Sequence, residues 1–171
     1  MSIKRQSVLV GLLGTILMSA CFFRSRAPHS EAPNLEVPYP DARDFLTDAG
    51  NAYTTVADTV QSVLSKPPVS EQEKVDHLMG SWVVSSLRET AKKIAELNLK
   101  YFAAGHRVRL TADEHLALTS AAEEIVKDAD DLVRDAKNQP VMPPSTKRSL
   151  EDAALRVRRA YDLIKNGPHQ Q

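Results

Sequence analysis

The stretch TADEHLALTSAAEEIVKDADDLVRDAK, residues 111–137, decides the fold class of this chain. Its apolar residues recur at alternating steps of four and three: Leu118, Ala122, Ile125, Ala129, Leu132 and Ala136. This is the heptad rhythm of a narrow seam along one side of an α-helix, as in coiled coils. Thr111 followed three residues later by Glu114 is the capping-box pattern of a helix start. Residues 111–137 therefore predict an amphipathic helix that packs lengthwise against other helices.

Two further segments have the same character. Residues 41–65 predict a helix whose apolar stripe is Ala42, Phe45, Ala49, Ala52, Val56, Val60 and Val63. Pro67 and Pro68 end this helix. The last predicted helix begins near Ser145, or at Ser149 with Asp152 three residues on, and ends at Asn166. Its stripe is Leu150, Ala153, Val157, Tyr161 and Ile164. The sequence Asn166-Gly167-Pro168 is a typical C-terminal stop signal.

The longest predicted helix covers residues 71–104, between a capping box at Ser70 and Glu73 and a candidate αL cap at Gly105. Its apolar spacing predicts a stripe made of Val75, Leu78, Met79, Trp82, Val83, Leu87, Ala91, Ile94, Asn98 and Phe102. We expect Trp82 in the core, because a lone aromatic residue at helical spacing is more often packed than exposed. Such a helix would be ~50 Å long, and we expect a bend at Gly80 with Ser85 and Ser86.

The connections between these four segments are short, and short connections join antiparallel neighbours. Residues 41–167 therefore predict an all-α, up-down-up-down four-helix bundle, followed by a tail at residues 168–171. The alternative is an elongated helical hairpin that completes its core by oligomerising.

The first 20 residues have the composition of an export signal. Lys4 and Arg5 supply positive charge, and an uncharged apolar stretch runs from Val8 to Met18. A membrane-spanning helix takes about 20 apolar residues, so this stretch is too short to span a bilayer and matches the apolar region of a signal peptide. The only cysteine, Cys21, comes directly after small residues.

The sequence Met18-Ser19-Ala20-Cys21 resembles the lipobox of bacterial lipoproteins, in which an apolar residue and two small residues precede an invariant cysteine. The resemblance implies that residues 1–20 are removed by cleavage between Ala20 and Cys21. It also implies lipid chains on Cys21, which together hold a protein stably on a membrane. Because Phe22 rather than Asp follows the cysteine, the resemblance implies an outer-membrane location facing the periplasm in a cell with two membranes.

Residues 21–40 predict a flexible linker between the lipid and the bundle, because four prolines interrupt every possible helix there: Pro28, Pro33, Pro38 and Pro40. Removal of residues 1–20 leaves 20 basic and 22 acidic residues, a net charge of −2. This near-neutral balance gives no signature of nucleic-acid binding.

The sequence shows no motif of known chemistry. Gly-x-Ser-x-Gly, Ser-x-x-Lys and His-Glu-x-x-His are absent, as are the paired Glu-x-x-His motifs of di-iron bundles. The histidines near carboxylates, His77 and His115, are interpreted as solvated residues near helix ends. We therefore expect no enzymatic activity, no metal site and no cofactor.

Charge separates between the last two predicted helices: residues 111–137 are rich in carboxylates, whereas residues 145–166 are rich in arginine and lysine. The plainer interpretation is attraction between the two helices within the bundle. The functional interpretation is a positive face offered to a partner, made of Arg107, Arg109, Arg156, Arg158 and Arg159.

A lipid anchor, a linker and a bundle without recognisable chemistry lead to the hypothesis of a non-enzymatic protein-interaction or assembly module in the bacterial envelope. Secretion-system pilotins and surface-exclusion lipoproteins are similar to it in layout, although no residues carry the likeness. The alternative is a periplasmic bundle that binds a small ligand or a metal near Trp82 or the histidines.

Overall fold

A computed structural model of the chain describes residues 35–36, 39–102 and 109–167. Its helices are α1 (Tyr39–Leu64), α2 (Glu71–Phe102), α3 (Ala112–Lys137) and α4 (Pro144–Asn166). Two short strands, β1 (Leu35–Glu36) and β2 (Arg109–Leu110), pair antiparallel. The export signal, Ala20, Cys21 and the candidate cap at Gly105 lie outside the described residues, and so remain predictions.

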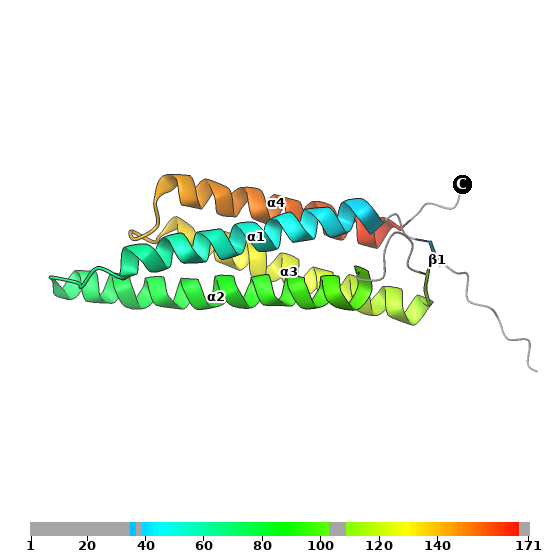
Figure 1. Ribbon diagram of the computed structural model, residues 1–171, viewed down its shortest axis with the longest axis horizontal. Coiled ribbons are helices and arrows are strands. Elements are labelled where there is room, and N and C mark those ends of the chain that lie inside the picture. Colours follow the sequence, from blue (N-terminus) through cyan, green and yellow to red (C-terminus); the bar gives the residue numbers. More distant parts are fainter. Residues whose placement is uncertain (1–34, 37–38, 103–108, 168–171) are drawn as a thin grey trace, which may run out of the picture. The chain divides into compact units, whose positions relative to one another are not determined.

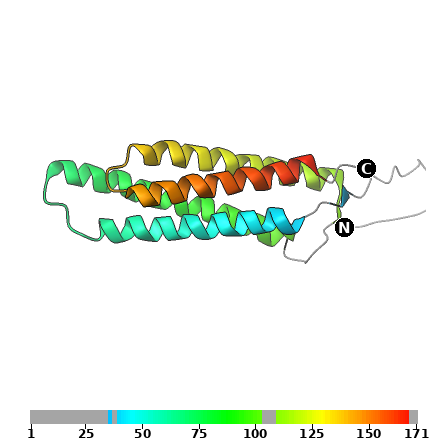
Figure 2. The ribbon, with the colours of Figure 1, turned by 90° about the horizontal axis from the view of Figure 1, so that it is seen from above.

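The four helices form an up-down-up-down bundle, as the sequence predicts (Figure 1). α1 packs against α2 and α4, and α3 closes the ring by packing against the same two helices. Each helix runs antiparallel to the next along the chain, and Figure 2 shows the same order from a perpendicular direction. One chain thus supplies all four sides of the core, which is the first of the two architectures that the sequence allowed.

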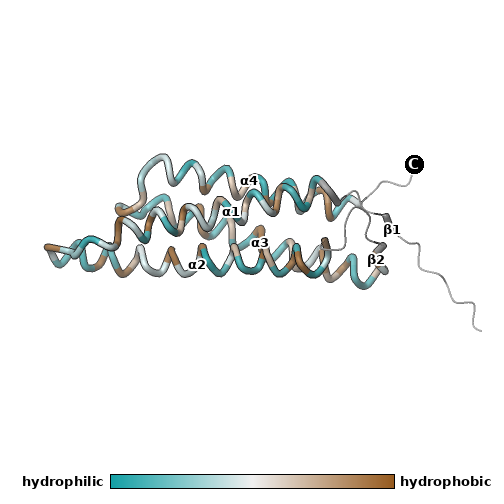
Figure 3. Tube along the Cα trace, in the orientation of Figure 1, coloured by the Kyte–Doolittle hydropathy of each residue, from teal (hydrophilic) through white to brown (hydrophobic). Residues whose placement is uncertain are grey.

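Small and aliphatic side chains fill the centre of the bundle, and hydrophobic positions recur at intervals along each helix (Figure 3). The seam predicted for α3 is confirmed in full, because all six of its residues are buried. In α1 the buried stripe is broader than predicted. Leu46 and Tyr53, which the sequence analysis left out, are at most 1% exposed, whereas Phe45 is only partly buried.

Side-chain caps fix the starts of α2 and α3. Thr111 Oγ1 accepts a hydrogen bond from the backbone N–H of Glu114 at 3.2 Å, and the Glu114 carboxylate accepts from the N–H of Thr111 at 2.9 Å. Ser70 Oγ likewise accepts from the N–H of Glu73 at 3.2 Å, but the Glu73 carboxylate accepts from the N–H of Val69 at 2.6 Å. The predicted capping box of α3 is therefore complete, and that of α2 is displaced by one residue in its second half.

The apolar side chains in the first turns of α2 are exposed, contrary to the predicted stripe. Four apolar side chains expected in the core are between 46% and 72% exposed: Val75, Leu78, Met79 and Trp82. Burial on α2 begins at Gly80 and continues through Val83 and Leu87. The prediction that Trp82 lies in the core is wrong, because apolar spacing alone does not say which flank of a helix faces its neighbours.

α2 runs as one helix through Gly80, where the sequence analysis expected a bend. A Cβ atom on Gly80 would lie 2.9 Å from Leu64 Cδ2 and 2.9 Å from Val141 Cγ2. The glycine therefore allows α2 to approach both the end of α1 and the α3–α4 connection closely.

Regular structure begins before Asp41, where the predicted linker 21–40 was expected to end. β1 lies within that linker and α1 begins at Tyr39, so the predicted linker extends too far. β1 pairs with β2, with Leu35 opposite Leu110, which ties the approach to α1 to the segment that precedes α3. The chain therefore enters the bundle at the end where α2 finishes and α3 starts (Figure 1).

Candidate functional site

Three of the arginines predicted as a partner face lie on α4 and make contacts within the bundle. Arg156 Nη1 lies 3.3 Å from the Asp48 carboxylate on α1. The Arg159 guanidinium lies 5.9 Å from the centre of the Phe45 ring, also on α1.

Arg158 lies on the opposite flank of α4, and its Nη2 atom is 2.6 Å from Asp130 Oδ1 on α3. This is the attraction between acidic and basic helices that the sequence analysis gave as its plainer interpretation. Arg107 lies outside the described residues, and only the backbone of Arg109 is described. The partner face made of these five arginines stays a prediction.

The two histidines in the described part of the chain, His77 and His115, do not form a metal-binding group with carboxylates. His115 Nε2 lies 2.9 Å from the backbone oxygen of Ile164, which ties α3 to the last turn of α4. Within the described residues, no group of three His, Cys, Asp or Glu side chains is placed to hold a metal ion. His106 lies outside those residues.

The exposed side chains of Val75, Leu78, Met79 and Trp82 form one stripe along the start of α2, which we call the α2 apolar stripe. Their spacing of three and four residues places them on one flank of the helix. That flank is rotated by roughly a third of a turn from the buried flank.

Helix length explains why this flank is uncovered. α2 has 32 residues whereas α3, its antiparallel neighbour, has 26 and ends at Lys137. The start of α2 extends past the α3–α4 connection in both perpendicular views (Figures 1 and 2). Beyond that connection no helix of the described bundle packs on this flank, so its apolar side chains meet solvent.

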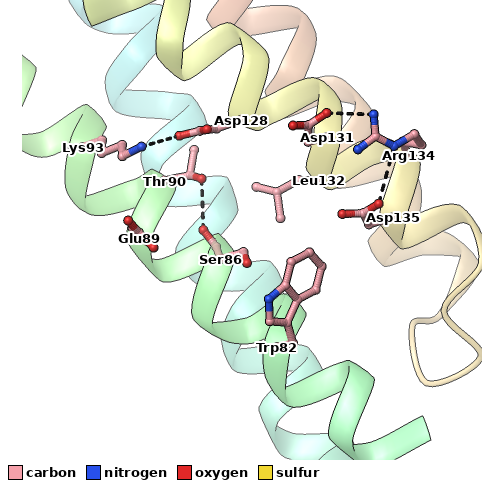
Figure 4. A pocket seen from close by; sticks show the side chains of 10 residues that line it. All are labelled: Trp82, Ser86, Glu89, Thr90, Lys93, Asp128, Asp131, Leu132, Arg134 and Asp135. Carbon is pink, nitrogen blue, oxygen red and sulfur yellow. Dashed lines mark hydrogen bonds and ion pairs between the residues drawn. The ribbon is translucent and has the colours of Figure 1, made fainter.

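A groove between α2 and α3 continues the stripe. It has a volume of about 380 Å³ and is lined by Trp82, Ser86, Glu89, Thr90, Lys93, Asp128, Asp131, Leu132, Arg134 and Asp135. The side chains of Trp82 and Leu132 point into the space between the two helices (Figure 4). On α2, Ser86, Glu89 and Lys93 follow Trp82 at steps of four, three and four, so the groove and the stripe share one flank.

The wall of the groove on α3 is acidic. Asp128, Asp131 and Asp135 line the groove at steps of three and four, and therefore share one side of the helix. Glu124 lies one turn before them on the same side. Arg134 binds Asp131 at 2.8 Å and approaches Asp135 at 3.6 Å.

Lys93 is the main cation on the α2 side of the groove. Its Nζ atom lies 2.7 Å from Asp128 and 2.9 Å from Glu124, which joins α2 to α3 (Figure 4 shows the bond to Asp128). These bonds, first that to Asp128, raise the pKa of Lys93 above its ordinary value, and the bond from Lys93 lowers the pKa of Glu124. The groove lining keeps an excess of negative charge, with four carboxylates against the two cations Lys93 and Arg134.

The combined surface offers apolar contact beside negative charge. None of the helices in the described ranges has a stretch apolar enough to cross a bilayer. The chain matches no protein-family model, no curated protein and no solved structure.

Sequence reasoning placed the stripe in the core, yet a signal for its exposure was present. The spacing in the stretch 75–94 supports two flanks, one through Val75, Leu78 and Trp82 and another through Val83, Leu87 and Ile94. A helix of a small bundle buries one stripe, so the second apolar stripe indicated an exposed apolar surface.

Proposed function

We propose that this chain is a lipid-anchored protein of the bacterial envelope whose helical bundle is a non-enzymatic interaction module. In this proposal Cys21 carries the lipid, residues 22–34 link it to the bundle, and the bundle binds or positions another envelope protein. The lipobox resemblance at Met18-Ser19-Ala20-Cys21 supports the anchor, and Phe22 favours the outer membrane.

The observation that carries the interaction role is the α2 apolar stripe. Monomeric proteins expose single apolar residues everywhere, but a contiguous exposed patch typically marks a binding surface. Four neighbouring apolar side chains, Trp82 among them, are each about half or more exposed, while the bundle already has a closed core of its own. Tryptophan is also enriched at the energetically dominant positions of protein interfaces.

The test is co-purification of the full-length lipoprotein from cross-linked membranes, with Cys21→Ser as the control. We expect wild type to recover one envelope protein in near-stoichiometric amount, and Cys21→Ser to be soluble or unprocessed and to recover much less of it. Processed, membrane-bound Cys21→Ser protein would contradict the anchor. Folded, lipidated wild type that recovers no partner would contradict the interaction role.

The groove beside Trp82 favours a second candidate, a periplasmic protein that binds a small ligand. Its volume of about 380 Å³ lies within the range of about 300–1,000 Å³ that is usual for ligand sites. Native mass spectrometry of the protein released from envelope would show a bound small molecule if this candidate holds. A mass equal to that of the lipidated chain alone would count against it.

A further inference from the structure

We propose that the α2 apolar stripe and the acidic groove beside it bind an amphipathic α-helix of a partner protein, with lysine and arginine flanking the apolar face of that helix. This inference rests on the proposed interaction function and names the surface and the chemistry of the partner.

The shape of the vacant flank favours a helix. α3 lies beside this flank of α2 up to its last turn, where Leu132 and Asp135 line the groove with Trp82, and the rest of the stripe lies beyond. A helix laid beside the start of α2 would continue the antiparallel packing that α3 makes further along. Its anchors at positions i, i+3, i+4 and i+7 would match the spacing of Val75, Leu78, Met79 and Trp82, which is the usual geometry of a helix bound in a groove.

The negative charge beside the stripe favours a partner helix with positive charge. Glu89 on α2 and Asp131 and Asp135 on α3 border the groove into which Trp82 points. Glu71 lies one turn before Val75 on the same flank of α2, where Lys74 is bonded to it. Basic residues on an incoming helix would be attracted to the groove end of this surface, and acidic ones would be repelled.

The same charge disfavours two other occupants. A second copy of the chain would bring one acidic border against another. An anionic lipid surface would be repelled, and the stripe also lies at the opposite end of α2 from the place where the chain enters the bundle (Figure 1). α1, whose 26 residues span about 39 Å at 1.5 Å per residue, separates those two ends.

The experiment is photo-crosslinking in intact cells with the full-length lipoprotein. A photoreactive amino acid replaces Leu78 in one variant and Leu99 in the other. Leu99 is the matched control, because it lies on the same helix and is 73% exposed against 72% for Leu78. Mass spectrometry of the adduct identifies the segment that is captured.

We expect position 78 to capture a partner segment with helical apolar spacing and flanking lysine or arginine, at least tenfold more than position 99. Capture of a second copy of this chain, of lipid, or of a segment without basic residues would overturn the proposal. No adduct at position 78 would overturn it too.

Two substitutions test the apolar and the charged parts separately in co-purification. Leu78→Ser should reduce recovery of the partner at least tenfold, with Leu99→Ser unchanged. Glu89→Lys should reduce recovery severalfold, whereas Glu123→Lys, at an exposed carboxylate of α3 outside the groove lining, should not. Equal recovery with Leu78→Ser and wild type would overturn this surface while the interaction function stands. No partner for wild type would overturn that function itself.

Discussion

Trp82 and Leu87 lie only five residues apart on α2, yet Trp82 is 53% exposed and Leu87 is fully buried. The difference comes from the flank of the helix on which each residue lies, because Leu87 faces the core and Trp82 faces the groove. Apolar spacing places both residues on α2 without showing which flank is buried, and the prediction for Trp82 was wrong for that reason.

Substitution of these two residues by alanine should have unequal effects on stability. Leu87→Ala should lower the free energy of unfolding by about 2–5 kcal/mol, since it removes buried methyl groups and leaves a cavity. Trp82→Ala should change it by no more than about 1 kcal/mol, as for other largely exposed positions. Urea unfolding followed by circular dichroism measures both. A larger loss for Trp82→Ala than for Leu87→Ala would contradict the assignment of flanks.

Tyr53 is a residue whose burial the sequence did not indicate. It is 0% exposed, and among the described residues its hydroxyl oxygen has no hydrogen-bond partner. Burial, followed by the charges of Asp130 and Asp128, raises the pKa of the Tyr53 hydroxyl well above its ordinary value. The ring of a tyrosine fills space inside an alanine-rich core, but burial of its hydroxyl away from water is unfavourable.

Tyr53→Phe should therefore leave the protein equally stable or stabilise it by up to about 1 kcal/mol, because it removes a polar group whose burial is unfavourable. Urea unfolding of the variant against wild type measures the change. Destabilisation by more than about 1 kcal/mol would instead mean that the hydroxyl makes a hydrogen bond.

The buried residues of a helix could be predicted from the sequence only where the helix has a single apolar flank. α3 has one narrow seam between charged positions, so its buried residues and its start at Thr111 follow from the sequence alone. α2 has two apolar flanks, and the packing and the lengths of its neighbours decide which is buried. Those lengths are a property of the assembled bundle, so local spacing in α2 does not reveal them.

Gly50 and Gly80 both lie where two parts of the bundle approach closely, and the space beside them differs. A Cβ atom on Gly50 would lie 3.3 Å from Ile94 Cγ2, whereas one on Gly80 would meet both Leu64 and Val141 at 2.9 Å. Alanine is favoured over glycine inside a helix by about 1 kcal/mol. Gly50→Ala should keep part of this gain, and Gly80→Ala should lose it because two side chains must move.

We therefore expect Gly50→Ala to be more stable than Gly80→Ala by about 1 kcal/mol in urea unfolding. The same order should appear in the melting temperatures of the two variants. Equal stabilities, or the reverse order, would show that Leu64 and Val141 move aside freely.

Ion pairs and helix caps make the free energy of unfolding of the bundle depend on pH. The backbone N–H of Thr111 and its hydroxyl lower the pKa of Glu114, and Lys93 lowers the pKa of Glu124, both from an ordinary value of 4.5. A carboxylate with a lowered pKa stabilises the folded state above its ordinary pKa, and that stabilisation is lost as pH falls through the folded value.

Stability should accordingly fall as pH drops below about 4.5, because protons then displace the bonds to Glu114 and Glu124. Lys93, whose pKa is raised from 10.5, keeps its contribution until pH rises above that value. Urea unfolding across pH 3–6 measures the loss. Glu124→Gln should reduce the dependence on pH in this range, and the control Glu123→Gln should not. An identical profile for Glu124→Gln and wild type would contradict the role of the Lys93 pair.

The bundle class could be predicted from the spacing of apolar residues, but the candidate site could not. The site depends on where α3 ends relative to α2, and on the side chains that this end leaves uncovered. The arginines predicted as a partner face followed from charge counts alone, which do not show that Arg158 lies against Asp130.

The pairing of β1 with β2 has a mechanical consequence. Any pull on the chain ahead of Leu35 reaches the backbone bonds between the two strands before it reaches the first turn of α1. The pulling force is thereby shared with the segment that leads into α3. Without this pairing, the force would act on α1 alone and unwind it from its first turn. The β1–β2 pair therefore takes up the force at the point where the chain enters the bundle. The far end of the bundle, with the α2 apolar stripe, does not bear that force.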